Sequence, residues 1–202
     1  MTSKVKTKKK PVKKATKKKV VKRRRVVMQK IDIDQIMLNN RELFLNEGVG
    51  SEVILRLIKS LRTLDSMSHK PILLWINSPG GSVTDGLALI NTMRTIQSNV
   101  ITIINSRVCS MGSHIAIAGN KRLIYDNGVM MFHDMTTGMI DYSDKIRDRA
   151  DYLEKYYKML ENNMRKYTKL SERQIKRART GEVWLFADDC LEVEAVDQVL
   201  EA

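Results

Sequence analysis

The chain has 202 residues, enough for one domain with a hydrophobic core, and 43% of them are hydrophobic. Its net charge of +13 comes from one end, because residues 1–30 contain fifteen Lys and Arg and no acid, which leaves 21 basic against 23 acidic side chains elsewhere. No apolar run approaches the roughly 20 residues that span a bilayer, and no apolar segment follows the basic N-terminus, so we expect neither a membrane protein nor a secretory signal.

The excess charge lies in a low-complexity segment. Residues 1–25 consist mostly of Lys, Arg, Val and Thr, a composition that cannot bury enough apolar surface to fold alone. We therefore expect a disordered basic arm at residues 1–25 and a folded domain at residues 26–202. A solubilising or targeting role fits this arm. Contact with a polyanion, such as nucleic acid or an acidic protein, fits it equally, and such contact would weaken steeply with salt.

Apolar periodicity predicts alternating strands and helices along the domain. Strands are expected around Ile31, Ile33 and Ile36 and at residues 41–45, 72–76, 100–104, 122–125 and 129–132. Helices are expected from a Ser51 cap to Leu64, through Leu87, Ile90 and Met93, from Ser110 to a stop at Gly119, and after a capping box at Ser171 and Gln174. Residues 184–187 and 196–200 close the domain. This alternation predicts an α/β fold with a mainly parallel sheet.

A long helix is expected from Asp141 to Tyr167. Its apolar positions recur at spacings of 4, 3, 4, 3 and 4, at Ile146, Ala150, Leu153, Tyr157, Leu160 and Met164. A heptad-like stripe of this kind is typical of a helix that packs on another helix. Packing on a partner subunit and packing on the domain's own core both fit it.

Three of the expected strands end in residues that can carry chemistry. The first ends in the glycine pair Gly80-Gly81, the second in a turn with Ser110, and the third in His133. Catalytic groups gather at the carboxyl ends of parallel strands, so we expect these residues to meet. The other histidines fit less well, since His69 lies in a polar loop and His114 lies inside a helix of small residues.

A serine and a histidine at neighbouring strand ends favour nucleophilic catalysis. A hydroxyl attacks well only when a base removes its proton, and His133 could do this for Ser110. The backbone N–H groups of Gly81 and Met111 could bind the oxyanion, each such donor contributing about 10²- to 10³-fold in rate. The two cysteines, Cys109 and Cys190, read as reduced, buried thiols of a cytoplasmic protein, and no His/Cys cluster has metal-ligand spacing. We expect no intrinsic metal or cofactor.

Three segments resemble the ClpP family, the proteolytic subunits of Clp proteases. Ile76-Asn77-Ser78-Pro79-Gly80-Gly81-Ser82-Val83-Thr84 resembles a family motif, Cys109-Ser110-Met111-Gly112-Ser113 resembles Ala-Ser-Met-Gly-Ala around its nucleophile, and Val129-Met130-Met131-Phe132-His133 resembles Val-Met-Ile-His. The likeness extends from about Arg41 to Leu200. It implies a ClpP/crotonase-like fold with a protruding handle helix.

The resemblance also implies roles for individual residues. Ser110 falls on the nucleophile, His133 on the general base, and Gly81 and Met111 on the oxyanion amides. The long helix corresponds to the handle that joins two heptameric rings into a closed barrel. Polypeptides would be cut inside it, and ATP would act only through a partner AAA+ unfoldase.

The third member of the implied triad departs from the family. The family's Asp precedes a Phe-Leu-Ser-Ala segment, and the matching residue here is Glu182. A carboxylate one methylene longer can still accept a hydrogen bond from the histidine. Asp188 and Asp189 are nearby alternatives, although they read as the start of the next helix. The arm replaces the family's axial loops, which suggests a specialised form, such as a phage processing protease, and puts docking to a Clp ATPase in doubt.

We therefore interpret the chain as a serine endopeptidase of the ClpP type. One rival is a structural subunit that has lost activity, which the Glu182 substitution favours and the retained Ser110 and His133 oppose. A second rival is an acyl-CoA enzyme of the crotonase group, which shares the fold but needs no Ser–His pair at these strand ends. A nucleic-acid-binding role of the arm is compatible with catalysis.

Overall fold

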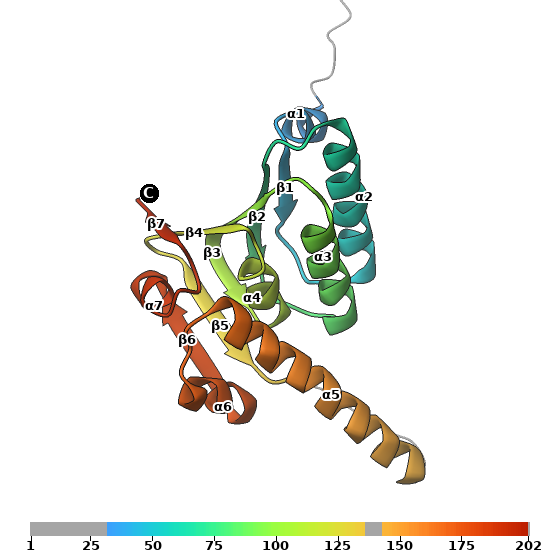
Figure 1. The fold of residues 1–202 in the computed structure, drawn as a ribbon, viewed down its shortest axis with the longest axis vertical. Coiled ribbons are helices and arrows are strands. Elements are labelled where there is room, and N and C mark those ends of the chain that lie inside the picture. The colour runs from blue at the N-terminus through green and yellow to red at the C-terminus, as the bar shows by residue number, and fades with distance from the viewer. Residues whose placement is uncertain (1–31, 136–142, 202) are drawn as a thin grey trace, which may run out of the picture. The chain divides into compact units, whose positions relative to one another are not determined.

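Strand β3 (Val100–Cys109) is the centre of the sheet that positions the candidate site. The structure, a computed structural model, describes residues 32–135 and 143–201, and Figure 1 shows their helices and strands. The predicted arm at residues 1–25 and the start of the long helix at Asp141 lie outside these ranges. The residues from Asp32 onward form one unit.

The elements alternate as the sequence predicts. The other strands are β1 (Glu42–Leu45), β2 (Ile72–Ser78), β4 (Lys121–Tyr125), β5 (Val129–His133), β6 (Glu182–Phe186) and β7 (Gln198–Leu200). The helices are α1 (Ile33–Asn39), α2 (Ser51–Met67), α3 (Val83–Thr95), α4 (Met111–Ala116), α5 (Ser143–Tyr167), α6 (Glu172–Thr180) and α7 (Ala187–Glu192). The expected α/β fold with a mainly parallel sheet is confirmed.

The sheet branches at β3, and the branch brings three strand ends together. Strands β1, β2, β3, β4 and β7 lie side by side in that order, all parallel. Residues 101–104 of β3 pair with β4, whereas residues 107–109 pair with β5. Strand β5 is also antiparallel to β6. Because β2, β3 and β5 are mutually parallel, their carboxyl ends point the same way.

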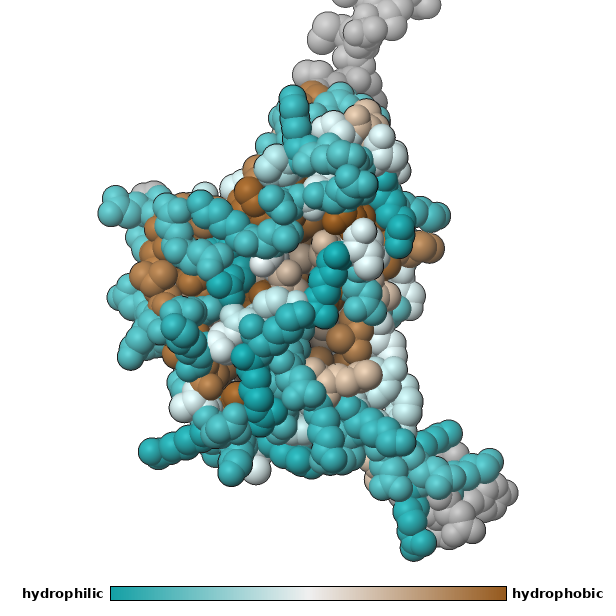
Figure 2. All heavy atoms as spheres, in the orientation of Figure 1, coloured by the Kyte–Doolittle hydropathy of each residue, from teal (hydrophilic) through white to brown (hydrophobic). Residues whose placement is uncertain are grey.

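The core lies between the sheet and the helices. Strand β2 alternates buried and half-buried residues, and α2 turns Val53, Ile54, Leu57, Leu61 and Leu64 inward. Both helices α2 and α3 appear on one side of β1 and β2 in Figure 1. Hydrophilic side chains cover most of the face shown in Figure 2, including α5. No helix within residues 32–135 or 143–201 is both long and apolar enough to cross a bilayer.

The predicted edge strand around Ile33 and Ile36 is wrong. These residues belong to helix α1, whose N-cap Asp32 accepts a hydrogen bond from the Gln35 N–H at 3.1 Å. Only the spacing of two between Ile31 and Ile33 fits a strand, whereas the spacing of three between Ile33 and Ile36 fits a helix, and the Asp32 cap agrees with the helix. The side chains of Ile33 and Ile36 are exposed.

Two predicted helix ends also need correction. Ser51 is the first residue of α2 rather than its cap, because Gly50 occupies the N-cap and the Ser51 hydroxyl donates to Asp85 Oδ2 at 3.0 Å. Helix α4 ends at Ala116 with Ile117 as its C-cap, not at Gly119. The predicted capping box of Ser171 and Gln174 is confirmed at the start of α6.

The stripe on α5 packs on the domain's own core in its second half. Tyr157, Leu160 and Met164 are buried, whereas Leu153 is half-buried and Ala150 is exposed. Of the two alternatives, packing within the domain therefore accounts for the later half of the stripe. The side chain of Ile146 lies outside the described set, and the role of the exposed half as a handle stays a prediction.

Candidate active site

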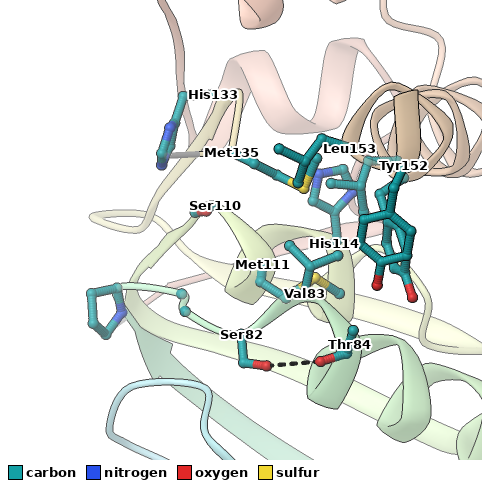
Figure 3. A pocket seen from close by; sticks show the side chains of 15 residues that line it. Ser82, Val83, Thr84, Ser110, Met111, His114, His133, Met135, Tyr152 and Leu153 are labelled. Atoms are coloured by element: carbon teal, nitrogen blue, oxygen red, sulfur yellow. Dashed lines mark hydrogen bonds between the residues drawn. The ribbon is translucent and has the colours of Figure 1, made fainter. Parts of the chain in front are cut away.

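The ends of β2, β3 and β5 converge on a cavity of about 600 Å³. The loop after β2 contributes Gly80 and Gly81. The start of α4 contributes Ser110 and Met111, and the end of β5 contributes His133 (Figure 3). Residues separated by more than fifty positions thus line one cavity, as expected at the carboxyl edge of a parallel sheet. Four of the five predicted site residues, all except Glu182, lie here.

Ser110 connects β3 to α4 in a strained conformation. Its φ of 54° and ψ of −126° are unusual for a residue with a side chain. Its N–H donates to the Met131 carbonyl at 2.8 Å, which ties the turn to strand β5. Although Ser110 occupies the N-cap of α4, its hydroxyl makes no capping bond. The hydroxyl is therefore not engaged as a helix cap, the ordinary role of a serine at this position.

Gly80 allows the loop after β2 to approach Ser110, a role that sequence reasoning missed. Its φ is +89°, and an added Cβ would lie 2.7 Å from the Ser110 Cβ and 2.9 Å from the Met111 nitrogen. Such distances leave no room for any side chain. The adjacent Gly-Gly pair was the available signal, since two glycines in one tight turn indicate that both positions are constrained.

The N–H of Gly81 points away from Val49, whose backbone bonds to the residues on either side of Gly81. The Val49 N–H donates to the Gly80 carbonyl and the Val49 carbonyl accepts from the Ser82 N–H, each at 2.8 Å. Successive N–H groups of an extended chain point to opposite sides, so the Gly81 N–H points away from Val49. Met111 is the first residue of α4, where the N–H has no partner within the helix. Two backbone donors can therefore serve an anion beside Ser110.

Glu182 faces His133 across a strand pair but does not line the cavity. The two residues are directly opposite in the antiparallel β5–β6 ladder, so both side chains lie on the same face of the sheet. Glu182 Oε2 accepts a hydrogen bond from Trp184 Nε1 at 2.8 Å, and the carboxylate is exposed. Of the alternatives, Asp189 accepts from the Phe186 N–H at 2.9 Å and both aspartates lie in the first turn of α7.

A buried histidine, His114, lies one helical turn after Ser110 and also lines the cavity. Its Nδ1 lies 3.3 Å from Asn163 Oδ1 of α5, and its ring packs edge-on against Phe132. Burial lowers the pKa of His114 to about 4, the bond to Asn163 opposing the shift. Sequence reasoning placed His114 inside a helix but had no signal for Asn163, which is 49 residues away.

We expect His114 to make folding stability depend on pH. An unfolded histidine titrates near pH 6.5, whereas the folded one titrates near 4, so the unfolded state binds more protons between these values. The free energy of unfolding should therefore fall as the pH drops from 6.5 to 4, by about 3 kcal/mol from this group. Urea unfolding at several pH values checks this, and His114→Phe should flatten the slope. An equal slope in both proteins would contradict it.

Neither cysteine is among the described residues that line the cavity. Cys109 and Cys190 are both buried and unbridged, and burial raises the pKa of the Cys190 thiol to about 12. Burial also raises the pKa of Cys109, next to Ser110. Within the part of the chain that the structure describes, no group of three or more His, Cys, Asp or Glu side chains is placed to hold a metal ion.

Comparison with known proteins connects this site to a protease family. The family model for Clp protease matches residues 24–202. The ATP-dependent Clp protease proteolytic subunit 1 of Streptomyces coelicolor is 30% identical over 166 residues, which cover 81% of this chain and 76% of the relative. The proteolytic subunit 2 of Prochlorococcus marinus strain MIT 9313 is 33% identical over 174 residues, covering 84% of this chain and 87% of the relative. Both similarities extend over most of the folded chain.

Proposed function

The chain belongs to the Clp protease family, a family of peptidases, and on this premise we propose that it is a serine endopeptidase. In this proposal Ser110 is the nucleophile, His133 the general base, Glu182 the acid, and Gly81 and Met111 the oxyanion donors. The observation that carries it is the convergence of Ser110, His133 and both backbone donors on one cavity. No intrinsic cofactor is required for this chemistry.

The proposed reaction follows from the positions of these groups. A peptide would lie extended beside Gly81, with its scissile carbonyl next to Ser110. His133 would take the hydroxyl proton as Ser110 Oγ attacks, and the N–H groups of Gly81 and Met111 would stabilise the negative oxygen. His133 would then give the proton to the leaving amine. Water, deprotonated by the same histidine, would release the acyl group and regenerate Ser110.

The contact made by Glu182 favours a second candidate, a structural subunit with impaired catalysis. Its Oε2 is bonded to the Trp184 indole. A carboxylate held elsewhere would not fix the tautomer of His133, and catalysis would fall accordingly. However, the second carboxylate oxygen can still accept a bond from His133, since Glu182 lies directly opposite on the neighbouring strand.

Labelling with a fluorophosphonate separates the two candidates. We expect the purified, assembled protein to react at Ser110, identified by mass spectrometry of the labelled peptide, because only an activated hydroxyl attacks such a probe readily. Denatured protein serves as the control and should not react. Absence of labelling in the assembled protein would contradict the peptidase proposal and favour the structural subunit.

The family also implies oligomeric rings that work with Clp ATPases. We propose that this chain forms heptameric double rings in which α5 joins the two rings, so that unfolded or small polypeptides are cut inside. Docking of an unfoldase and polyanion contact by residues 1–25 stay predictions. A salt titration of nucleic-acid binding, with and without residues 1–25, would test the second of these.

A further inference from the structure

The cavity extends well beyond the groups proposed to cut the peptide. Figure 3 shows Ser110 and His133 at one end and His114, Leu153 and Tyr152 at the other. His114 lies four positions after Ser110, which corresponds to about 6 Å along α4. A substrate whose carbonyl lies at Ser110 could therefore extend a side chain along α4 toward His114.

The walls of this far end carry no net charge. The described residues that line the cavity include no Asp, Glu, Lys or Arg. Apolar groups come from Val83, Met135 and Leu153, and the aromatic rings come from Tyr152 and Tyr156. A charged side chain that entered here would lose its hydration without gaining a partner of opposite charge, which is costly. The lining thus selects against charged side chains and for large uncharged ones.

His114 adds a hydrogen-bonding ring to this lining, which also contains Tyr152 and Tyr156. Its Nδ1 is paired with the amide oxygen of Asn163, so Nδ1 carries the proton and Nε2 carries a lone pair. His114 as a whole is only 3% exposed, and its ring makes an edge-on contact with Phe132. Because burial keeps the pKa of His114 at about 4, the ring is neutral at physiological pH. Nε2 can then accept a hydrogen bond but cannot pair with an anion.

We propose that this end of the cavity is the side-chain specificity pocket, and that it selects large uncharged side chains ending in a hydrogen-bond donor, such as tyrosine or glutamine. The inference rests on the proposed peptidase function. In it, His114 Nε2 accepts from the phenol or amide of the residue whose carbonyl is attacked. His114 is a specificity-determining residue here and takes no part in proton transfer.

Matched peptides test the pocket by kinetics. Tyrosine and phenylalanine differ by one hydroxyl, and glutamine and methionine have similar length and volume. We expect kcat/KM to favour tyrosine over phenylalanine, and glutamine over methionine, by about tenfold or more, because an unpaired buried acceptor is costly. His114→Phe should bring both ratios to about one or reverse them. His69→Phe makes the same replacement at an exposed histidine bonded to Asp65, outside the cavity, and should keep the ratios. Thermal unfolding of each variant checks folding.

A binding measurement separates failure of the pocket from failure of the peptidase. Calorimetric titration of the Ser110→Ala variant with peptides that end in tyrosine or phenylalanine needs no catalysis. We expect tighter binding of the tyrosine peptide by about tenfold, and loss of this difference in Ser110→Ala/His114→Phe. The pocket assignment would be overturned if Ser110→Ala bound the tyrosine and phenylalanine peptides equally well. It would also be overturned if the kcat/KM ratios were unchanged in His114→Phe. Absence of hydrolysis together with the tyrosine preference in binding would overturn the peptidase proposal alone.

Discussion

Replacement of Ser110 by alanine is expected to lower kcat/KM for peptide hydrolysis by about 10⁴-fold or more. The hydroxyl is the only atom removed, and the strained backbone that holds it is tied by the Ser110 N–H to Met131, by Gly80 and by helix α4. These contacts do not involve the hydroxyl, so the variant should fold and assemble normally. The remaining rate would come from the N–H groups of Gly81 and Met111. Hydrolysis of a fluorogenic peptide measures the effect.

Ser106→Ala is the matched control for this experiment. Ser106 lies on β3, four residues before Ser110, and is exposed. Its replacement removes the same atom away from the cavity and should leave the rate within a few-fold of the wild type. Sedimentation of both variants checks that assembly is unchanged. Comparable rates in Ser110→Ala and the wild type would show that another residue is the nucleophile.

The three strands that lead to the site were predictable because local patterns determine them. The runs before Gly80, Ser110 and His133 are short, apolar and β-branched, and each stops at a polar or glycine residue. The meeting of the three ends then follows from parallel pairing. Even so, β3 continues to Cys109, five residues past the predicted end at Ile104. Its polar segment stays extended because residues 107–109 pair with β5, a tertiary contact that no local pattern reveals.

The contacts that adjust the site depend on packing and were not predictable in the same way. Gly80 lies against Ser110 across 30 residues of sequence, and His114 bonds Asn163 across 49. The prediction of a strand at Ile33 and Ile36 relied on the spacing of two between Ile31 and Ile33, whereas the spacing of three between Ile33 and Ile36 is that of a helix. By contrast, the Trp184–Glu182 bond joins alternate residues of one strand, which share a face, so this contact could have been anticipated.

Replacement of Glu182 by glutamine is expected to lower kcat by about 10²- to 10⁴-fold with KM little changed. A glutamine keeps the size of the side chain but loses the charge that holds the His133 tautomer and stabilises the imidazolium. Glu182→Asp should recover much of the rate if backbone adjustment lets the shorter carboxylate reach His133. Initial rates at saturating peptide, measured at the same pH for each variant, provide the comparison.

Measuring kcat for three further variants identifies the carboxylate that supports His133. They are Trp184→Phe, Asp188→Asn and Asp189→Asn. Trp184→Phe removes the indole donor that now holds Glu182 Oε2, so kcat should stay the same or rise as the carboxylate becomes free for His133. Asp188 and Asp189 lie in the first turn of α7, where Asp189 accepts from the Phe186 N–H, so their replacement should affect stability more than kcat. If instead Asp188→Asn or Asp189→Asn abolishes catalysis while Glu182→Gln does not, the acid of the triad is an aspartate of α7. Glu182 would then have only a structural role in β6. A rate that falls with Trp184→Phe as much as with Glu182→Gln would mean that the indole positions the carboxylate, and the bond between them would then be part of the catalytic arrangement.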